Sequence, residues 1–355
     1  MGIDLSITCS SLWSSGPSKS LRAAPIYIIG TERSGSNLMR VILNAHSGID
    51  IPHPPHICRY FADLVSGYGD IQQTKPRRTL VRDILRLLKV HIYPWDLQID
   101  AERVVAESTC LLSITAAIYD QHLEASGKRR WGNKSTFMVH HVDEALAQDP
   151  GARFIWLVRD PRDVAASSRK SVFSPCHPWL TGRLWAQQQA EAHSQMVRHP
   201  EAVLQVHYEE LLAQPEATIQ TVCDFLGEEM EPALLAHEKT PAAKKGAALS
   251  ESWQNTGGPI LKGNSGKYRR ALSAHEIAQV EQAAGEMMDA LGYARDGKPA
   301  ATPGSLGMAQ IQLKDTVWTL QVEGRSLLKD ANHWRRWKRA VLMGWLGWWR
   351  SELDA

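Results

Sequence analysis

Apolar and polar positions along the chain alternate between short apolar runs and longer stretches with helical spacing. Two short runs are apolar throughout, as expected for strands buried on both faces of a sheet: IYIIG after Pro25 and FIWLV before Arg159. Each leads into a helical pattern, SNLMRVILNAH after the first and RDVAASSRKS near the second. The segment AVLQVHYEELL predicts a third strand that runs into a loop. This order predicts an α/β fold with a mostly parallel sheet whose strands bind ligands at their carboxyl ends.

Helix ends and composition shifts divide the chain into three parts. A helix over EATIQTVCDFLG is expected to stop at Gly227, and another begins with a capping box made by Ser273 and Glu276. Residues 1–24 are rich in serine and are expected to form a flexible leader. Residues 25–295 hold the strands and helices of the main domain. Residues 296–355 begin in a Gly/Pro-rich linker and end in a tail rich in tryptophan and basic residues.

The composition narrows the function classes. With 355 residues, 43% apolar and 22% charged, the chain is an ordinary globular protein, and a net charge of +2 gives no sign of a nucleic-acid partner. Its five cysteines are scattered and form no C-x-x-C pair, which excludes a disulfide framework and a cysteine zinc site. No apolar run is long enough for a membrane span, and no signal peptide is recognisable. We therefore expect a cytoplasmic protein.

The loop after the first strand, GTERSGSN, has the glycine spacing of a phosphate-binding P-loop. The backbone amides of such a loop and the start of the next helix hold an anion, here through Ser34 and Gly35. Ser36 and Asn37 stand where an ATP-binding loop has Lys-Ser or Lys-Thr, so the grip on Mg²⁺ and a γ-phosphate is missing. Arg33 offers a fork of donors instead.

A second anion site is predicted beside the first. Arg159 stands at the end of a strand, and Ser167 follows eight residues later in the next helix, so that both side chains can reach one phosphate. The alternative is a charged helix start in which Asp160 is the cap. Two anion sites on adjacent units of strand and helix indicate a nucleotide with phosphates at both ends of its ribose.

These motifs resemble those of the sulfotransferases that use 3′-phosphoadenosine 5′-phosphosulfate (PAPS). GTERSGSNLMRVILNAH is similar to their 5′-phosphosulfate loop and LVRDPRDVAASS to their 3′-phosphate motif. In VHYEELLAQPEATIQTVCDFLG, the resemblance implies that Tyr208 approaches the adenine. In KGNSGKYRRALS, it implies that Lys262, Gly263 and Lys267 close over the 3′-phosphate. Leu261 stands where the family often has arginine.

The resemblance spans roughly residues 25–295 and implies a P-loop-like, three-layer α/β/α fold with a mostly parallel central sheet and a C-terminal helical tail. It implies metal-independent transfer of a sulfuryl group from PAPS to a hydroxyl or amine. In this family a carboxylate or histidine after the first helix serves as base, here His56 or, alternatively, His53. Lys134, in a segment similar to W-x-x-K-T/S-P, and Arg33 are the candidates for stabilising the transferred group.

Other functions remain open at this point. The rivals are a catalytically silent protein that binds PAP (3′-phosphoadenosine 5′-phosphate) or a membrane, and a P-loop kinase of a small molecule. The acceptor, whether a small molecule, a lipid or a carbohydrate, is not readable from the sequence.

The tail carries a helical stripe with basic residues along its first half. A helix of this kind packs on the domain or on a second subunit, or lies at a membrane surface as a peripheral contact. The stripe consists of Trp334, Trp337, Val341, Trp345 and Trp348, and the basic residues are Arg335, Arg336, Lys338 and Arg339.

Overall fold

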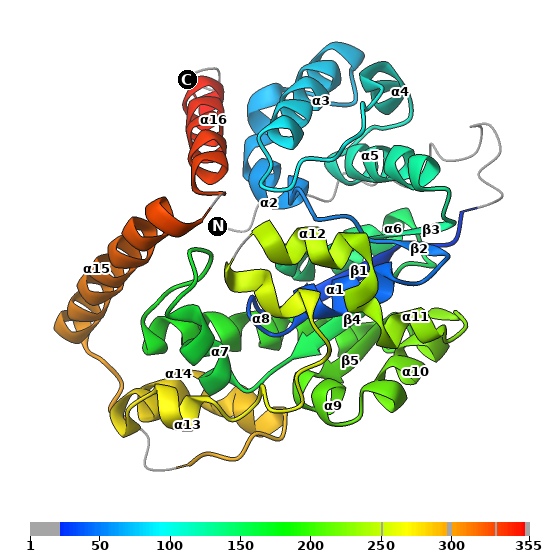
Figure 1. The fold of residues 1–355 in the computed structure, drawn as a ribbon. Helices are drawn as coiled ribbons and strands as arrows, with labels where there is room; N and C mark the ends of the chain where they lie inside the picture. The colour runs from blue at the N-terminus through cyan, green and yellow to red at the C-terminus, as the bar shows by residue number, and fades with distance from the viewer. Residues whose placement is uncertain (1–21, 250, 297–299, 331, 352–355) are drawn as a thin grey trace. The chain divides into compact units, whose positions relative to one another are not determined.

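The computed structural model describes residues 22–249, 251–296, 300–330 and 332–351 (Figure 1). In these residues the chain forms a five-stranded sheet in the order β2-β3-β1-β4-β5. Strands β2 and β3 pair in parallel, as do β4 and β5. The strands are β1 (Ile26–Gly30), β2 (Ile49–Asp50), β3 (Arg130–Lys134), β4 (Arg153–Val158) and β5 (Val203–His207).

Helices connect the strands and follow them, so the predicted α/β fold with a parallel sheet and a C-terminal helical tail is confirmed. They are α1 (Ser36–Asn44), α2 (Ile57–Phe61), α3 (Thr74–Lys89), α4 (Ala101–Ala106), α5 (Leu111–Ser126), α6 (Val142–Gln148), α7 (Pro161–Ser168), α8 (Pro178–Arg198), α9 (Tyr208–Ala213), α10 (Pro215–Leu226), α11 (Pro232–Leu235), α12 (Pro241–Leu249), α13 (Tyr268–Ala271), α14 (Ala274–Ala290), α15 (Ser305–Lys329) and α16 (His333–Ser351).

The chain folds into two compact units, each built from separate stretches of sequence. Of the described residues, unit 1 contains 22–26, 48–152 and 335–351. Unit 2 contains residues 27–47 and 153–334. Most of the predicted leader lies outside the described residues, but Arg22 forms ion pairs with Asp120 and Asp149 within unit 1.

Unit 2 contains the helix ends that the sequence predicts. Gly227 ends α10 with a φ of 68°, a left-handed conformation that glycine adopts without strain. Ser273 caps α14, and both bonds of its capping box with Glu276 are present. One expectation is wrong: β5 runs into helix α9 and not into a loop. Glu209 and Glu210 lie in the first turn of α9, where carboxylates stabilise the positive end of the helix dipole.

Unit 1 has its core among α2, α3, α4 and α5. Leu80, Ile84 and Leu87 of α3 are fully buried there with Ile118 of α5. Strand β3 has the sequence RWGNK, which lacks an apolar run and therefore gives no strand signal. Trp131 holds it in place, because its ring is buried and its Nε1 donates a hydrogen bond to Asp120 at 2.8 Å.

A buried arginine joins α7 to α14 within unit 2. The guanidinium of Arg162 donates to Glu281 at 2.8 Å and to Asp160 at 2.7 Å, and it lies 4.4 Å from the ring centroid of Tyr268. Arg162 is 4% exposed and Glu281 is 0% exposed. Removing one partner of such a network leaves an uncompensated buried charge.

We expect Arg162→Leu to lower the free energy of unfolding by about 3–5 kcal/mol, because Glu281 and Asp160 lose their cation inside the fold. Urea denaturation followed by circular dichroism measures the change. The matched control is Arg78→Leu. It removes an exposed arginine of α3 that pairs with Glu102 of α4 on the surface. Its unfolding curve should overlay that of the wild type, and equal curves for both variants would contradict a structural role for Arg162.

Candidate active site

The P-loop-like segment joins β1 to α1 in unit 2, and both of its glycines are required by close contacts. Gly30 has a φ of 127°, and a Cβ there would lie 2.4 Å from the carbonyl oxygen of Leu157 in β4. Gly35 has a φ of 90°, and its Cβ would lie 2.3 Å from the Tyr208 ring. The chain can therefore turn tightly between them and direct the first amides of α1 toward the loop.

Arg33 sits in this loop with a φ of 71°, a left-handed conformation that is unusual for a residue with a side chain. Its Nε donates a hydrogen bond to Ser167 Oγ of α7 at 3.0 Å. Burial and the charge of nearby Arg159 lower the pKa of Arg33. The hydroxyl of Ser34 is buried and has no hydrogen-bond partner within the described part of the chain. A buried guanidinium and an unpartnered hydroxyl in one loop are suited to an anionic ligand.

Arg159, at the end of β4, binds two loops from distant parts of the sequence. Its Nη1 donates to the carbonyl of Arg33 at 2.9 Å, and its Nη2 donates to the carbonyl of Asn264 at 3.0 Å. The guanidinium also lies 4.5 Å from the ring centroid of Tyr208. The Nε of Arg159 is buried without a partner in the residues that the structure covers. Arg159 thus holds two loops together and still has one N–H group, at Nε, without a hydrogen-bond partner among the described residues.

The segment KGNSGKYRR lies against the start of α7, and sequence reasoning missed one residue on each side of this contact, Asn264 in the segment and Asp163 in α7. Asn264 donates from Nδ2 to the Tyr208 hydroxyl at 2.6 Å. Asp163 accepts from the amides of Gly266 and Tyr268 at 2.6 and 2.9 Å. Both lie inside quoted motifs, but their partners, a tyrosine hydroxyl for Asn264 and two backbone amides for Asp163, are far away in the sequence, so the residue pattern does not reveal them.

The other predicted binding residues of unit 2 are placed as follows. Lys262, Gly263 and Lys267 are exposed on the loop that Asp163 and Arg159 hold. Ser36 is buried at the first position of α1, and Asn37 accepts a hydrogen bond from Arg40 at 2.8 Å. The structure thus gathers Arg33, Ser167, Arg159 and Tyr208 through direct contacts.

The predicted catalytic residues His56 and Lys134 both belong to unit 1. His56 precedes α2 with a φ of 57°, and its Nδ1 lies 3.3 Å from the hydroxyl of Ser135. Burial and then the charge of Lys134 hold the pKa of His56 well below its ordinary value. Among the residues that the structure describes, only Arg33 and His56 have a positive φ without being glycine. Such strained positions concentrate at functional sites.

His53 has a different environment, in the interior of unit 1. It is 5% exposed, and its Nδ1 shares a hydrogen bond with His91 Nε2 at 3.1 Å. Its ring stacks on Tyr93, and its carbonyl accepts a bond from Trp95. Burial lowers the pKa of His91 to about 3, so that ring of the pair stays neutral. These contacts hold the His53 ring within the interior of unit 1.

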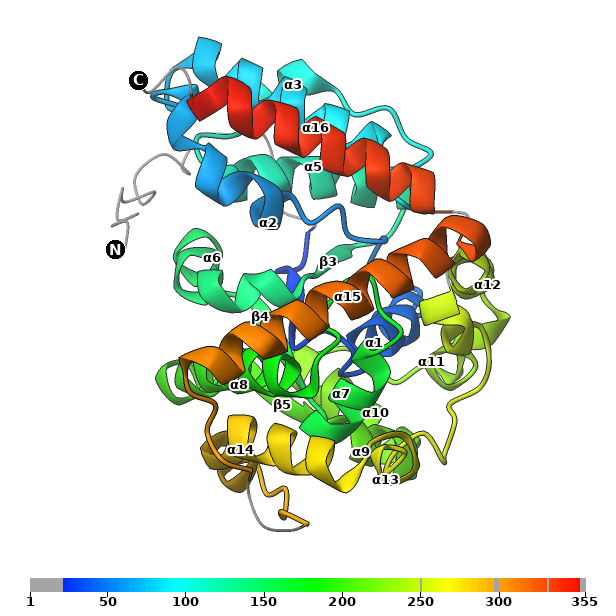
Figure 2. The same cartoon turned by 90° about the vertical axis from the view of Figure 1, so that its left-hand side faces the viewer.

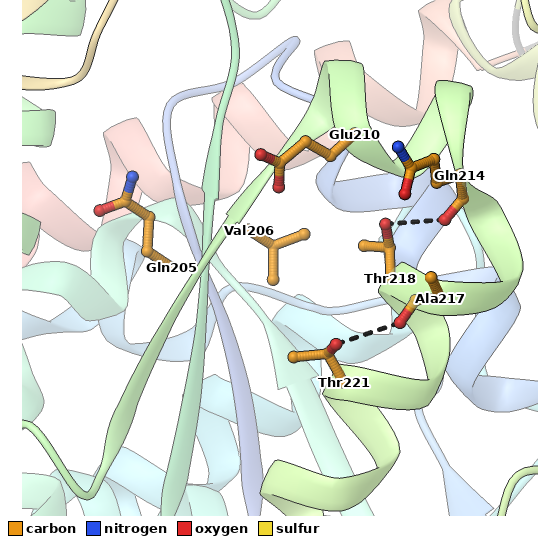
Figure 3. A pocket seen from close by; sticks show the side chains of 7 residues that line it. All are labelled: Gln205, Val206, Glu210, Gln214, Ala217, Thr218 and Thr221. Atoms are coloured by element: carbon orange, nitrogen blue, oxygen red, sulfur yellow. Dashed lines mark hydrogen bonds between the residues drawn. The ribbon is translucent and has the colours of Figure 1, made fainter.

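An open pocket of 320 Å³ lies beside β5, α9 and α10 in unit 2 (Figure 3). None of the predicted site residues lines it, and the Thr218 and Thr221 hydroxyls bond to carbonyls of α10 and its cap. We therefore assign it no role. The described residues contain no group of three or more His, Cys, Asp or Glu side chains placed to hold a metal ion. None of the helices in the described ranges is long and apolar enough to cross a membrane.

Comparison with known proteins decides the family. The model of the sulfotransferase family matches residues 25–232. The chain belongs to this family. Protein-tyrosine sulfotransferase 1 of Danio rerio is 28% identical to this sulfotransferase over 238 residues, which cover 65% of the chain and 61% of the relative. An uncharacterized protein of Aquifex aeolicus (strain VF5) is 23% identical over 239 residues, or 64% of the chain and 28% of that protein. Both matches span less than two thirds of the relative.

Solved structures agree on the fold. The sulfotransferase domain from the curacin biosynthetic pathway superposes with a TM-score of 0.56 at 18% identity, covering 78% of this sulfotransferase and 100% of that domain. The sulfotransferase domain of the Synechococcus PCC 7002 olefin synthase gives a TM-score of 0.52 at 19% identity, covering 79% of this chain and 99% of the domain. At this identity the likeness shows the fold alone.

We expect His56 to titrate well below the histidine reference of about 6.5. Burial and the positive charge of Lys134 both disfavour the imidazolium, so the ring stays neutral to lower pH. Lys134→Met should raise the pKa of His56, because it removes the largest contribution after burial. NMR titration of the imidazole, assigned with His56→Gln, measures both values. An unchanged pKa in Lys134→Met would contradict the proximity of the two side chains.

Proposed function

We propose that this sulfotransferase transfers a sulfuryl group from PAPS to a hydroxyl or amine of an acceptor. The observation that carries the proposal is the pair of guanidiniums of Arg33 and Arg159, held close together at the end of β4. Arg159 donates to the backbone of Arg33, and its charge lowers the pKa of that residue. Two like charges in a partly buried place are stabilised by an anion between or beside them.

The residues around this pair fit a nucleotide that carries phosphates at both ends of its ribose. Buried donors without partners in the described ranges include Ser34 Oγ, Ser168 Oγ and Arg159 Nε. The amides at the start of α1 add a positive helix end. The Tyr208 ring lies 4.5 Å from the Arg159 guanidinium, next to the residues proposed to hold the 3′-phosphate. Lys262 and Lys267 supply exposed cations on the adjoining loop.

The roles of the residues follow from their chemistry. In the transfer, the acceptor atom attacks sulfur, and the bond from sulfur to the 5′-phosphate breaks with its electron pair on the phosphate oxygen. Arg33, with the loop amides of Ser34 and Gly35, stabilises negative charge that builds on that phosphate. Arg159 and Ser167 hold the 3′-phosphate. Lys134 stabilises the sulfuryl oxygens.

His56 takes the acceptor proton in this proposal. The ring is neutral at physiological pH because its pKa is lowered, so it can accept a proton without first losing one. The Ser135 hydroxyl at Nδ1 orients the ring and leaves Nε2 for the acceptor. The buried contacts of His53 with His91 favour His56 over His53.

The acceptor is proposed only by class, as a small molecule, a lipid or a carbohydrate. The Danio rerio relative is named for a tyrosine acceptor, which supports an oxygen atom as the attacking group. A protein that only binds PAP is the second candidate, and kinetic loss in His56 variants separates it from an enzyme. A kinase is disfavoured because Ser36 and Asn37 replace the lysine and hydroxyl that bind Mg-ATP.

We expect Arg159→Ala to weaken PAP binding by about 2–3 kcal/mol, the scale of a lost charge-assisted contact. Isothermal titration calorimetry with PAP, and with ATP and Mg²⁺ as the competing ligand, measures the affinity. Tight, Mg²⁺-dependent ATP binding without a response to PAP would overturn the proposed donor.

Two controls show whether Arg159 contacts the nucleotide. Adenosine 5′-phosphosulfate lacks the 3′-phosphate and should bind the wild type and Arg159→Ala about equally. Equal losses for both ligands would mean that Arg159 only supports the loop at Arg33. Arg198→Ala removes an exposed arginine near the start of β5, at the other end of that strand from Tyr208, and should leave PAP affinity unchanged.

We expect His56→Ala to retain PAP affinity and to reduce turnover by roughly 10²–10⁴-fold, the usual contribution of a general base. The acidic limb of the wild-type rate profile should lie below about 6.5, because burial and Lys134 lower the pKa of His56. Transfer of labelled sulfate from PAPS to an acceptor found in a metabolite extract provides the assay.

His53→Ala is the comparison for this prediction. It should cost little turnover beyond what its loss of stability explains, since His53 contacts the protein interior. A larger loss in His53→Ala than in His56→Ala would transfer the role of base to His53. Near-normal rates in both variants would refute a histidine base.

A further inference from the structure

Helix α16 has two apolar faces, and one of them is buried in unit 1. Leu346 is fully buried in the cluster that contains Leu80 and Ile84 of α3, with Leu342 and Met343 packed beside it. Figure 2 shows α16 running alongside the helices of this unit. The guanidinium of Arg339 lies 5.1 Å from the ring centroid of Tyr60. These contacts fix how the helix is rotated about its axis.

The opposite face therefore points outward and stays apolar. Its side chains recur at the intervals of a helical stripe, so that they form one continuous strip along the helix. A strip of exposed tryptophans is costly in water, whereas the indole ring suits the boundary between lipid headgroups and acyl chains. The strip consists of Trp334 (60% exposed), Trp337 (54%), Val341 (51%), Trp345 (45%) and Trp348 (58%).

The charge of α16 favours one of the two partners that could bind its tryptophan strip, a lipid surface or a second copy of the chain. The sequence of the helix contains five arginines and lysines and no aspartate or glutamate. Lys338 is exposed next to the tryptophans, whereas Arg335 donates from Nη1 to the carbonyl of Ile92 in unit 1 at 3.3 Å. A second copy of the chain would bring two such cationic helices together, which is unfavourable. A negatively charged lipid surface complements the helix, and each basic residue near it adds to binding.

We propose that α16 lies flat on an anionic membrane surface, with its tryptophan strip at the level of the lipid headgroups and Lys338 beside the phosphates. The buried face keeps the helix attached to unit 1, so the contact is peripheral. This placement is independent of the proposed donor and of the proposed base.

Co-sedimentation of the full chain with lipid vesicles tests the proposal. Vesicles of phosphatidylcholine mixed with phosphatidylglycerol should bind the protein, and added salt should weaken the binding. Vesicles of phosphatidylcholine alone should bind it far less. Replacing Trp337, Trp345 and Trp348 together by serine should weaken binding to the mixed vesicles by about tenfold or more. Lys338→Glu should weaken it by at least about fivefold.

The matched control changes exposed apolar residues on a helix of mixed charge. Leu313 and Leu320 of α15 are each 66% exposed, and Leu313→Ser with Leu320→Ser should leave vesicle binding unchanged. Equal losses in both multiple variants would mean unspecific apolar adsorption and would overturn the proposal. All variants change exposed side chains and should melt with the wild type, which shows that they fold.

Sedimentation velocity without lipid tests the alternative occupant. The wild type and the triple tryptophan variant should sediment with the same oligomeric state. A wild-type dimer that the tryptophan variant dissociates, without binding to anionic vesicles, would assign the strip to a second copy of the chain and overturn the lipid assignment.

Discussion

The guanidinium of Arg159 joins three segments that are far apart in the sequence. It binds the carbonyls of Arg33 and Asn264 and lies against the ring of Tyr208, and Asn264 in turn donates to the Tyr208 hydroxyl. Each of these segments contains one of the motifs that resemble the sulfotransferases. The order of these motifs in the sequence does not show that they lie close together; the contacts of Arg159 show it. The arginine is thus a structural link, and the unpartnered Nε that it keeps within the described residues supports its proposed role toward an anionic ligand.

Backbone conformation independently supports functional roles for Arg33 and His56. A left-handed conformation costs roughly 1–2 kcal/mol for a residue with a Cβ. Glycine would remove this cost at Arg33 and His56, but it would also remove the guanidinium and the imidazole. The strain is maintained by surrounding contacts, such as the bond from Arg159 to the Arg33 carbonyl. Side chains kept at such positions fit a chemical role better than a packing role.

The sequence predicts those parts of the structure that depend on local patterns. The strands with continuous apolar residues, the Gly227 helix end and the Ser273 capping box all follow from neighbouring residues. Strand β3 does not, because RWGNK is placed by the burial of Trp131 and by its bond to Asp120. The contacts of Asp163 and Asn264 do not follow either, because their partners lie in distant segments of the sequence. The sequence does not separate His53 from His56, because both occur in one proline-rich stretch. Their different hydrogen-bond partners are visible only in the structure.

The electrostatics of His56 connect its basicity to the presence of an anion. Lys134 lowers the pKa of His56 because its positive charge opposes protonation. An anionic group that pairs with Lys134 would offset this charge and raise the proton affinity of the ring. The imidazole would then be a weak base in the protein alone and a stronger base when a sulfuryl donor supplies the negative charge. In the proposed reaction, such coupling would tie the basicity of the imidazole to the charge beside Lys134.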